Sequence, residues 1–131
     1  MTDGVDLRSL LERVQKAQGP DPFLDKELIV GFDLRDDAMW VQWSDGRNWV
    51  ARPVTGSIDA ATQLVSKLLP DYGWGVHVLI PGRFRAQVTE RSPIRPMPNI
   101  GDAPTPELAL CTALLKALIA KAEAEEGVGE F

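Results

Sequence analysis

The sequence predicts a single mixed α/β (α+β) domain with a mainly antiparallel four-stranded sheet and about four helices. Two patterns predict this class. Apolar residues recur at spacings of three and four in four segments, as in amphipathic helices, and alternate along four others, as in strands. The strands come in two pairs joined by short turn sequences, and such hairpins are antiparallel. With 131 residues, the domain forms a core without a disulfide or a metal.

The first two helices are separated by a short turn. Between Val5 and Ala17 the leucines and Val14 follow a helical spacing, and Gly19 ends the segment. A second helix begins at Asp21-Pro22, because the aspartate side chain accepts from free backbone N–H groups and proline is tolerated at the first helical position. We expect this helix to end near Gly31.

A hairpin follows the second helix. Residues 38–43 alternate between apolar and other side chains, Ser44-Asp45-Gly46 supplies a turn, and Arg47 to Val54 reads as the second strand. Pro53 lacks an N–H donor, so this strand ends there or lies at an edge of the sheet.

A third helix and a second hairpin complete the middle of the chain. Ser57 is a good N-cap for a helix that runs to Leu69. Residues 74–80 and 84–88 then alternate on either side of Pro81-Gly82, which is a turn sequence. They predict two antiparallel strands.

The last part of the chain is a proline-rich loop followed by a helix. Half of the ten prolines lie between Ser92 and Pro106, which predicts a stiff loop rather than a linker between domains. Thr105-Pro106-Glu107 opens the last helix, whose apolar stripe extends to Ala122. Residues 124–131 are acidic and contain glycine, so we expect a frayed tail.

Short motifs in a particular order cover nearly the whole chain. They are Leu10-Leu11-Glu12-Arg13-Val14 with Gly19-Pro20-Asp21 and Leu24-Asp25, then Ser57-Ile58-Asp59-Ala60-Ala61, Gly73-Trp74, and Thr105-Pro106-Glu107-Leu108-Ala109-Leu110-Cys111 with Ala113-Leu114-Leu115-Lys116-Ala117-Leu118. In their order and spacing they resemble the phage alpha-beta-alpha sandwich domain family of small phage and prophage proteins. The resemblance implies one three-layer sandwich over residues 1–131 and a phage or prophage origin. It implies no catalytic residues, and the stretch 83–98 is richer in Arg and Pro than expected of such proteins.

Composition excludes several classes of partner. The formal net charge of −5 argues against general nucleic-acid binding, because phosphate contacts need Lys and Arg. No apolar run approaches the roughly 20 residues of a membrane span, and Asp3 and Asp6 stand where a secretory leader would be basic. Cys111 is the single cysteine, so no disulfide forms within the chain. We therefore expect a protein of the host cytoplasm.

No complete catalytic or metal-binding motif is present. His77 is the only histidine and has no evident nucleophile beside it, while Cys111 lies on the apolar stripe of the last helix and is expected to be an inert thiol. The glycines form no phosphate-binding fingerprint. Four acidic residues lack the spacing of a calcium loop, namely Asp33, Asp36, Asp37 and Asp45. We expect no catalytic residue, no metal and no cofactor, and thus not an enzyme.

The first hairpin carries three of the four tryptophans. Neighbouring residues of a strand point to opposite faces, so Trp40 and Trp43 cannot both face one layer of an unbroken strand. Either two separate cores bury both rings, or one ring faces a base or a partner protein.

Positive charge is concentrated in one segment. Between Tyr72 and Gly101 there are four arginines and one glutamate, a local charge of +3 in a chain of net −5. The arginines are Arg83, Arg85, Arg91 and Arg95. Guanidinium groups suit phosphates and carboxylates, which indicates an anion or partner site. The alternative is a strand edge kept soluble by charge, or contact with another subunit.

These observations favour a non-catalytic phage or prophage binding protein. It would counter host defence either by sequestering a phosphate-bearing small molecule, such as a nucleotide signal, or by blocking a defence protein. Arg83, Arg85, Arg91 and Arg95, with Trp40 and Trp43, are the predicted binding residues. The alternative is a structural or assembly protein that self-associates through its hairpin edge. A homo-oligomer is expected, because an acidic body and a basic loop complement each other.

Overall fold

A computed structural model of the chain describes residues 6–32, 40–42, 49–91 and 98–128. These residues form four helices and five strands. In chain order the elements are α1 (Leu7–Lys16), α2 (Pro22–Gly31), β1 (Trp40–Gln42), β2 (Trp49–Ala51), α3 (Ile58–Leu68), β3 (Tyr72–Ile80), β4 (Arg83–Glu90), β5 (Pro98–Ala103) and α4 (Pro106–Val128). The mixed α+β class and the four predicted helices are confirmed.

The described strands form two separate antiparallel ladders. β1 pairs with β2, while β3, β4 and β5 form a three-stranded sheet with β4 in the centre. The prediction of a four-stranded sheet from two hairpins is therefore wrong. Its third strand is β5, at the end of the proline-rich segment, where Pro, Asn, Gly and Asp give little intrinsic strand preference. Pairing with β4 and packing on α4 override that local preference.

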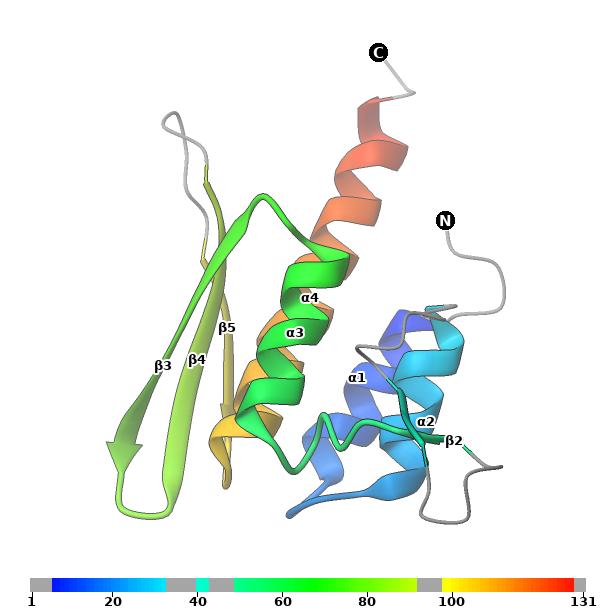
Figure 1. Cartoon of the computed structure of the whole chain (residues 1–131). Helices are drawn as coiled ribbons and strands as arrows, with labels where there is room; N and C mark the ends of the chain where they lie inside the picture. The colour runs from blue at the N-terminus through cyan, green and yellow to red at the C-terminus, as the bar shows by residue number, and fades with distance from the viewer. Residues whose placement is uncertain (1–5, 33–39, 43–48, 92–97, 129–131) are drawn as a thin grey trace.

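Figure 1 shows the layers into which these elements pack. The three-stranded sheet forms one layer, α3 and α4 lie against one of its faces, and α1, α2 and the β1–β2 hairpin lie beyond them. α4 contacts all three strands of the sheet as well as α1 and α3. In the described part of the chain no helix covers the other face of the sheet. Among the described elements the sheet is therefore an outer layer, and the three-layer sandwich that the resemblance implies stays a prediction.

The sequence of α4 explains its central position. Residues 108–115 are all buried, so this helix has no solvated face in its first turns. A helix that is apolar all round needs packing partners on every side, and α4 has the sheet on one side and other helices on the rest. It continues to Val128, so the segment expected to be a frayed tail is helical as far as that residue. Alanine and glutamate, which dominate this segment, are strong helix formers.

Side-chain N-caps begin the first three helices, and two of these caps are the ones that the sequence predicts. The Asp21 carboxylate accepts the N–H groups of Phe23 and Leu24, and Ser57 Oγ accepts the Ala60 N–H. Asp6 caps α1 in the same way. These contacts satisfy backbone donors that have no partner within the helix.

A buried carboxylate joins α2 to the segment after β2. Asp25, which is 4% exposed, accepts the Thr55 N–H at 2.7 Å and the Thr55 hydroxyl at 2.6 Å. The same hydroxyl oxygen accepts the Asp21 N–H at 2.8 Å. Burial raises the pKa of Asp25, although the bonds from Thr55 oppose that shift.

Candidate functional site on the open face of the sheet

The uncovered face of the three-stranded sheet carries the predicted arginines. Alternate residues of a strand point to opposite faces, and Ala86 and Val88 of β4 are buried on the helical side. The intervening residues of β4 and their cross-strand partners therefore point away from the helices. We call this surface the open face; it is formed by His77, Arg83, Arg85, Gln87, Thr89, Ile100 and Asp102.

The middle of the open face contains a paired arginine. Arg85 Nε donates to Asp102 Oδ1 at 2.8 Å, and Arg85 Nη2 donates to Asp102 Oδ2 at 2.9 Å. The two residues lie directly opposite each other on β4 and β5. The guanidinium group lowers the pKa of Asp102, and the carboxylate raises the pKa of Arg85. Arg85 therefore has an internal counter-ion before any ligand arrives.

The other two described arginines lie at the two ends of β4. Arg83 is the exposed first residue of the strand, next to the Pro81-Gly82 turn. Arg91 follows the last residue, and its guanidinium lies over Gly73, where an added Cβ atom would be 3.7 Å from Arg91 Nε. Eight residues of extended chain separate Arg83 from Arg91, a span of roughly 26 Å. Arg95 lies outside the described residues.

The structure places the backbone of Trp40 away from the strand that carries Arg83 and Arg85. Trp40 belongs to β1, which pairs only with β2 among the described strands and lies on the far side of α3 and α4 from the sheet (Figure 1). Trp43 and the Trp40 side chain lie outside the described residues. The aromatic residues of the sheet itself, Tyr72, Trp74 and Phe84, alternate onto the helical side. Among the described residues of the open face, the only ring is therefore the imidazole of His77, and no Trp, Tyr or Phe ring lies there.

His77 and Cys111 lie on opposite sides of the sheet. His77 is exposed on the open face opposite Arg85, whereas Cys111 is buried in α4 and its thiol faces the Val54 carbonyl oxygen at 3.7 Å. Burial raises the pKa of the Cys111 thiol to about 12. The two side chains cannot act as a catalytic pair, and the thiol has the inert character that its position on the apolar stripe predicts.

The acidic cluster predicted not to bind calcium, Asp33, Asp36, Asp37 and Asp45, lies outside the described residues. Within the part that the structure describes, no three His, Cys, Asp or Glu side chains come together as metal ligands would. None of the described helices is both long and apolar enough to cross a membrane.

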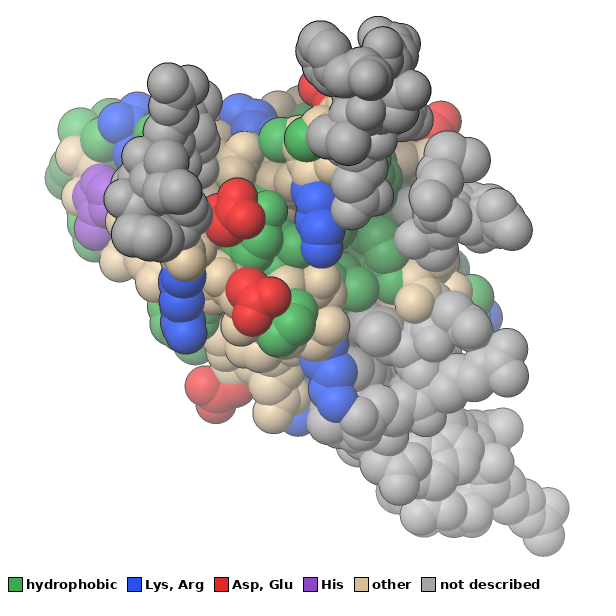
Figure 2. Space-filling model, turned by 90° about the horizontal axis from the view of Figure 1, so that it is seen from above, with side chains coloured by type: hydrophobic (Ala, Val, Ile, Leu, Met, Phe, Trp, Pro, Cys, Tyr) green, Lys and Arg blue, Asp and Glu red, His purple; other side chains and the backbone are tan. Residues whose placement is uncertain are grey.

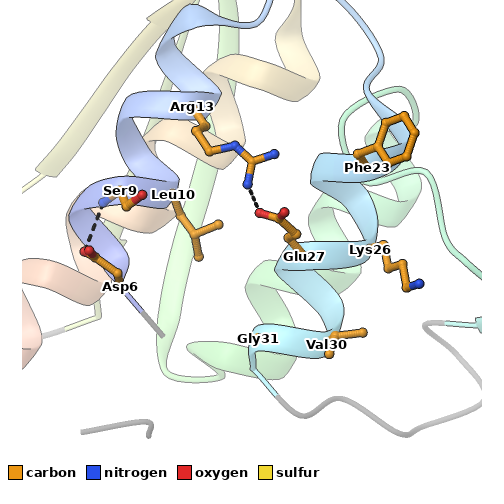
Figure 3. Close-up of a pocket in the computed structure, with 9 residues that line it drawn as sticks. All are labelled: Asp6, Ser9, Leu10, Arg13, Phe23, Lys26, Glu27, Val30 and Gly31. Carbon is orange, nitrogen blue, oxygen red and sulfur yellow. Dashed lines mark hydrogen bonds and ion pairs between the residues drawn. The ribbon is translucent and has the colours of Figure 1, made fainter. Parts of the chain in front are cut away.

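Sequence reasoning missed a groove between the first two helices (Figure 3). It has a volume of about 560 Å³, and Leu10 of α1 points into the space between the helices. Arg13 of α1 and Glu27 of α2 form an ion pair across it. The exposed Phe23 lies at one end on α2, and Val30 lies toward the other. The signal for this groove was present in the sequence, since Phe23, Glu27 and Val30 recur at helical spacing.

Sequence reasoning also missed which strand forms an exposed edge. β3 is an outer strand of the sheet, whereas β4, which carries Arg83 and Arg85, is the central strand. The alternative explanation of these arginines as the protection of an edge therefore does not apply to β4. The available signal was the absence of Lys, Arg, Asp, Glu and Pro from residues 72–80.

Charge on the surface seen from above is mixed rather than segregated. Figure 2 shows basic and acidic side chains interspersed among hydrophobic ones there.

Comparisons of the chain with protein-family models, with curated proteins and with solved structures find no match. The function is therefore inferred from the chemistry of this chain.

Proposed function

We propose that this protein is a non-catalytic binding protein that holds an acidic surface of a partner protein against the open face. The observation that carries the proposal is the pair of exposed arginines at the two ends of the central strand, on a sheet face that no described helix covers. Asp102 pairs with Arg85 between them and also interacts with Arg83, so the three described arginines against this one carboxylate leave a net positive charge on the face.

The spacing of the charges favours a protein over a small anion. A mononucleotide is too short to bridge two arginines whose backbones are roughly 26 Å apart along one strand. It would have to compete with Asp102 for Arg85, and among the described residues of this face only the small imidazole ring of His77 offers it a stacking surface. A protein surface with separated carboxylates reaches both arginines at once. Its complementary charge also raises the association rate by electrostatic steering.

The resemblance to phage sandwich proteins supplies the biological part of the proposal. It favours a phage or prophage protein that acts in the host cytoplasm, and a host defence protein as the partner that is blocked. Sequestration of a nucleotide signal is the competing version of the same role. The alternative, a structural or assembly protein that self-associates, is supported by the exposed apolar side chains of the outer strand β3 and is tested by looking for the chain in purified virions.

The test is a phage-plating assay with matched charge variants. Cells that carry one defence system each would express the chain, its Arg83→Glu/Arg91→Glu variant, or a control Lys26→Glu/Lys121→Glu variant. Both variants change the net charge equally, but Lys26 and Lys121 lie on α2 and α4, away from the open face. We expect the parent and the control to restore plating against at least one system, and the arginine variant to lose most of that effect.

A calorimetric titration separates the two kinds of ligand. Cyclic and linear nucleotides are titrated into the purified chain, and the proposal expects no binding heat. Saturable heat with a nucleotide that disappears in the arginine variant would favour sequestration of a small molecule. An arginine variant as active as the parent in the plating assay would overturn the role of the open face.

A further inference from the structure

In the part of the chain that the structure describes, no strand pairs with the outer edge of β3, and the strand itself has none of the usual protection. It is nine residues long, and it carries no charged residue and no proline. Edge strands expose unpaired N–H and C=O groups to any other strand, and soluble proteins normally block such edges with charge, proline or very short strands. β3 uses none of these devices.

The opposite edge of the same sheet shows the contrast. β5 begins with Pro98, is six residues long and carries Asp102. The Lys116 ammonium group of α4 also donates to the carbonyl oxygen of Ile100 at 2.9 Å. One edge of the sheet is therefore protected, and the other is available for pairing.

The side chains of β3 also favour burial. Half of the exposed large hydrophobic residues of the described chain lie on this strand: Trp74 is 46% exposed, Val78 62%, Leu79 40% and Ile80 58%. Scattered exposed apolar residues are ordinary, but a group on a free strand edge marks an interaction surface.

We propose that a second copy of this chain pairs with β3 in antiparallel orientation, about a two-fold axis at Val76. This register joins two three-stranded sheets into a continuous six-stranded sheet. Between Trp74 and Val78 the pairing of β3 with β4 is regular, so the same segment presents a regular free edge. The axis at Val76 places Trp74 opposite Val78 of the second copy, and the reverse, so four exposed apolar side chains are buried in two symmetric pairs.

The residue pattern of β3 is self-complementary about this axis, which favours a second copy of this chain as the partner. The register that pairs Trp74 with Val78 also places Gly75 opposite His77, so a residue without a side chain faces a large one. β3 carries no ionic side chain and only the single histidine, His77, so the pairing brings no two like charges of β3 together. Trp74 also borders a hollow of about 500 Å³ against Thr62 and Lys67 of α3, which leaves room for the second copy's side chains.

This assembly is independent of the proposed partner binding and compatible with it. Because the two-fold axis is perpendicular to the sheet, the helices of both copies lie on one side. Both open faces then lie on the other side and form one continuous surface. The dimer consequently presents two sets of Arg83 and Arg91 side by side.

The first test is the mass of the full chain in solution, measured by sedimentation equilibrium at several concentrations. We expect twice the 14.4 kDa of the chain. Val78→Lys should raise the dimer Kd at least roughly tenfold, because two ammonium groups enter one apolar interface. Ile100→Lys, which introduces the same residue at an exposed position of β5, is the matched control and should leave the Kd unchanged.

The second test fixes the register by cysteine cross-linking under mild oxidation. In Val76→Cys the two thiols face each other across the axis, with Cβ atoms about 4.5–5.5 Å apart, so a small adjustment allows a disulfide. In Leu79→Cys the two thiols are six residues apart, roughly 20 Å, and should not link. Cys111 does not interfere because it is buried.

A parent chain that stays monomeric up to the highest concentration would overturn the proposal. So would equal effects of Val78→Lys and Ile100→Lys on the Kd, or equal cross-linking at positions 76 and 79. These measurements need no partner protein, so failure of the dimer and failure of the proposed host-protein binding are told apart.

Discussion

Gly101 allows β5 to lie unusually close to α4, and the substitution Gly101→Ala tests how tightly these two elements are packed. A Cβ atom at this position would lie 2.5 Å from the Ala109 carbonyl oxygen, 2.7 Å from the Ala113 nitrogen and 2.7 Å from Thr112 Cβ. Two of these three atoms belong to the backbone of α4, so no side-chain rotation relieves the clash. Gly101 itself is buried.

The magnitude follows from the displacement that the methyl group requires. Contacts between carbon atoms are most favourable at about 3.5–4.0 Å, so α4 would have to move by about 1 Å from β5. A gap of that size forfeits a quarter to a half of the dispersion energy of the contacts it opens. Because α4 carries much of the buried leucine core, we expect a loss near the upper end of the usual overpacking range, about 3 kcal/mol.

The assay is urea unfolding followed by circular dichroism, at one protein concentration for all variants. Gly75→Ala is the matched control, since its Cβ would meet only the Gln87 side chain at 3.6 Å on the open face. That variant should change the free energy of unfolding by less than about 0.5 kcal/mol. If Gly101→Ala lost less than about 1 kcal/mol, or no more than Gly75→Ala, the close approach of β5 to α4 would be refuted.

Three further predictions concern the core, the turn and a buried charge. Burial raises the pKa of the Cys111 thiol from 9.0 to about 12, which lowers the thiolate fraction at pH 8 by roughly 1,000-fold. Ellman's reagent should therefore react with this thiol only as fast as the protein opens. Rapid reaction in native buffer would contradict the burial of Cys111. Gly82 has a φ of +81°, so Gly82→Ala should lower the free energy of unfolding by about 1 kcal/mol, whereas Gly19→Ala, with a normal φ and open space, should not. Because burial raises the pKa of Asp25 above its unfolded value, the protonated carboxyl favours the folded state, and this contribution is lost as the pH rises above about 4 through the folded pKa. Urea unfolding between pH 4 and 7 should then show that the free energy of unfolding of the parent falls, with rising pH, relative to that of Asp25→Asn. A difference between the two that is constant with pH would contradict the raised pKa of Asp25.

Local features of the fold could be predicted from the sequence because they depend on residues close together in the chain. The cap at Ser57 needs only the next turn of backbone, and the Pro81-Gly82 turn needs only the positive φ that glycine accepts. The alternation in residues 74–80 and 84–88 follows from the two-residue period of a strand. Each of these predictions is confirmed by α3 and by the β3–β4 hairpin.

The candidate site could be predicted only in part, because residues of one short sequence segment can still lie far apart when the segment is an extended strand. The segment with the local charge of +3 includes β3, β4 and the start of β5, which form the sheet, while its role in binding stays a prediction. The local charge does not reveal that β4 holds Arg83 and Arg91 at opposite ends, nor that Asp102 pairs with Arg85. That carboxylate lies 17 residues away along the chain and comes into contact only when β5 pairs with β4.

The sequence by itself determined the four helices, the caps predicted at Asp21 and Ser57, the second hairpin and the buried character of Cys111. Only the tertiary structure decided that β4 is central and that β5 completes the sheet, and that the described elements leave one edge of β3 and one face of the sheet uncovered. The physical reason is the range of the interactions. Periodicity and capping act within a few residues, whereas strand order depends on backbone hydrogen bonds, which carry little sequence information, and on packing against α4.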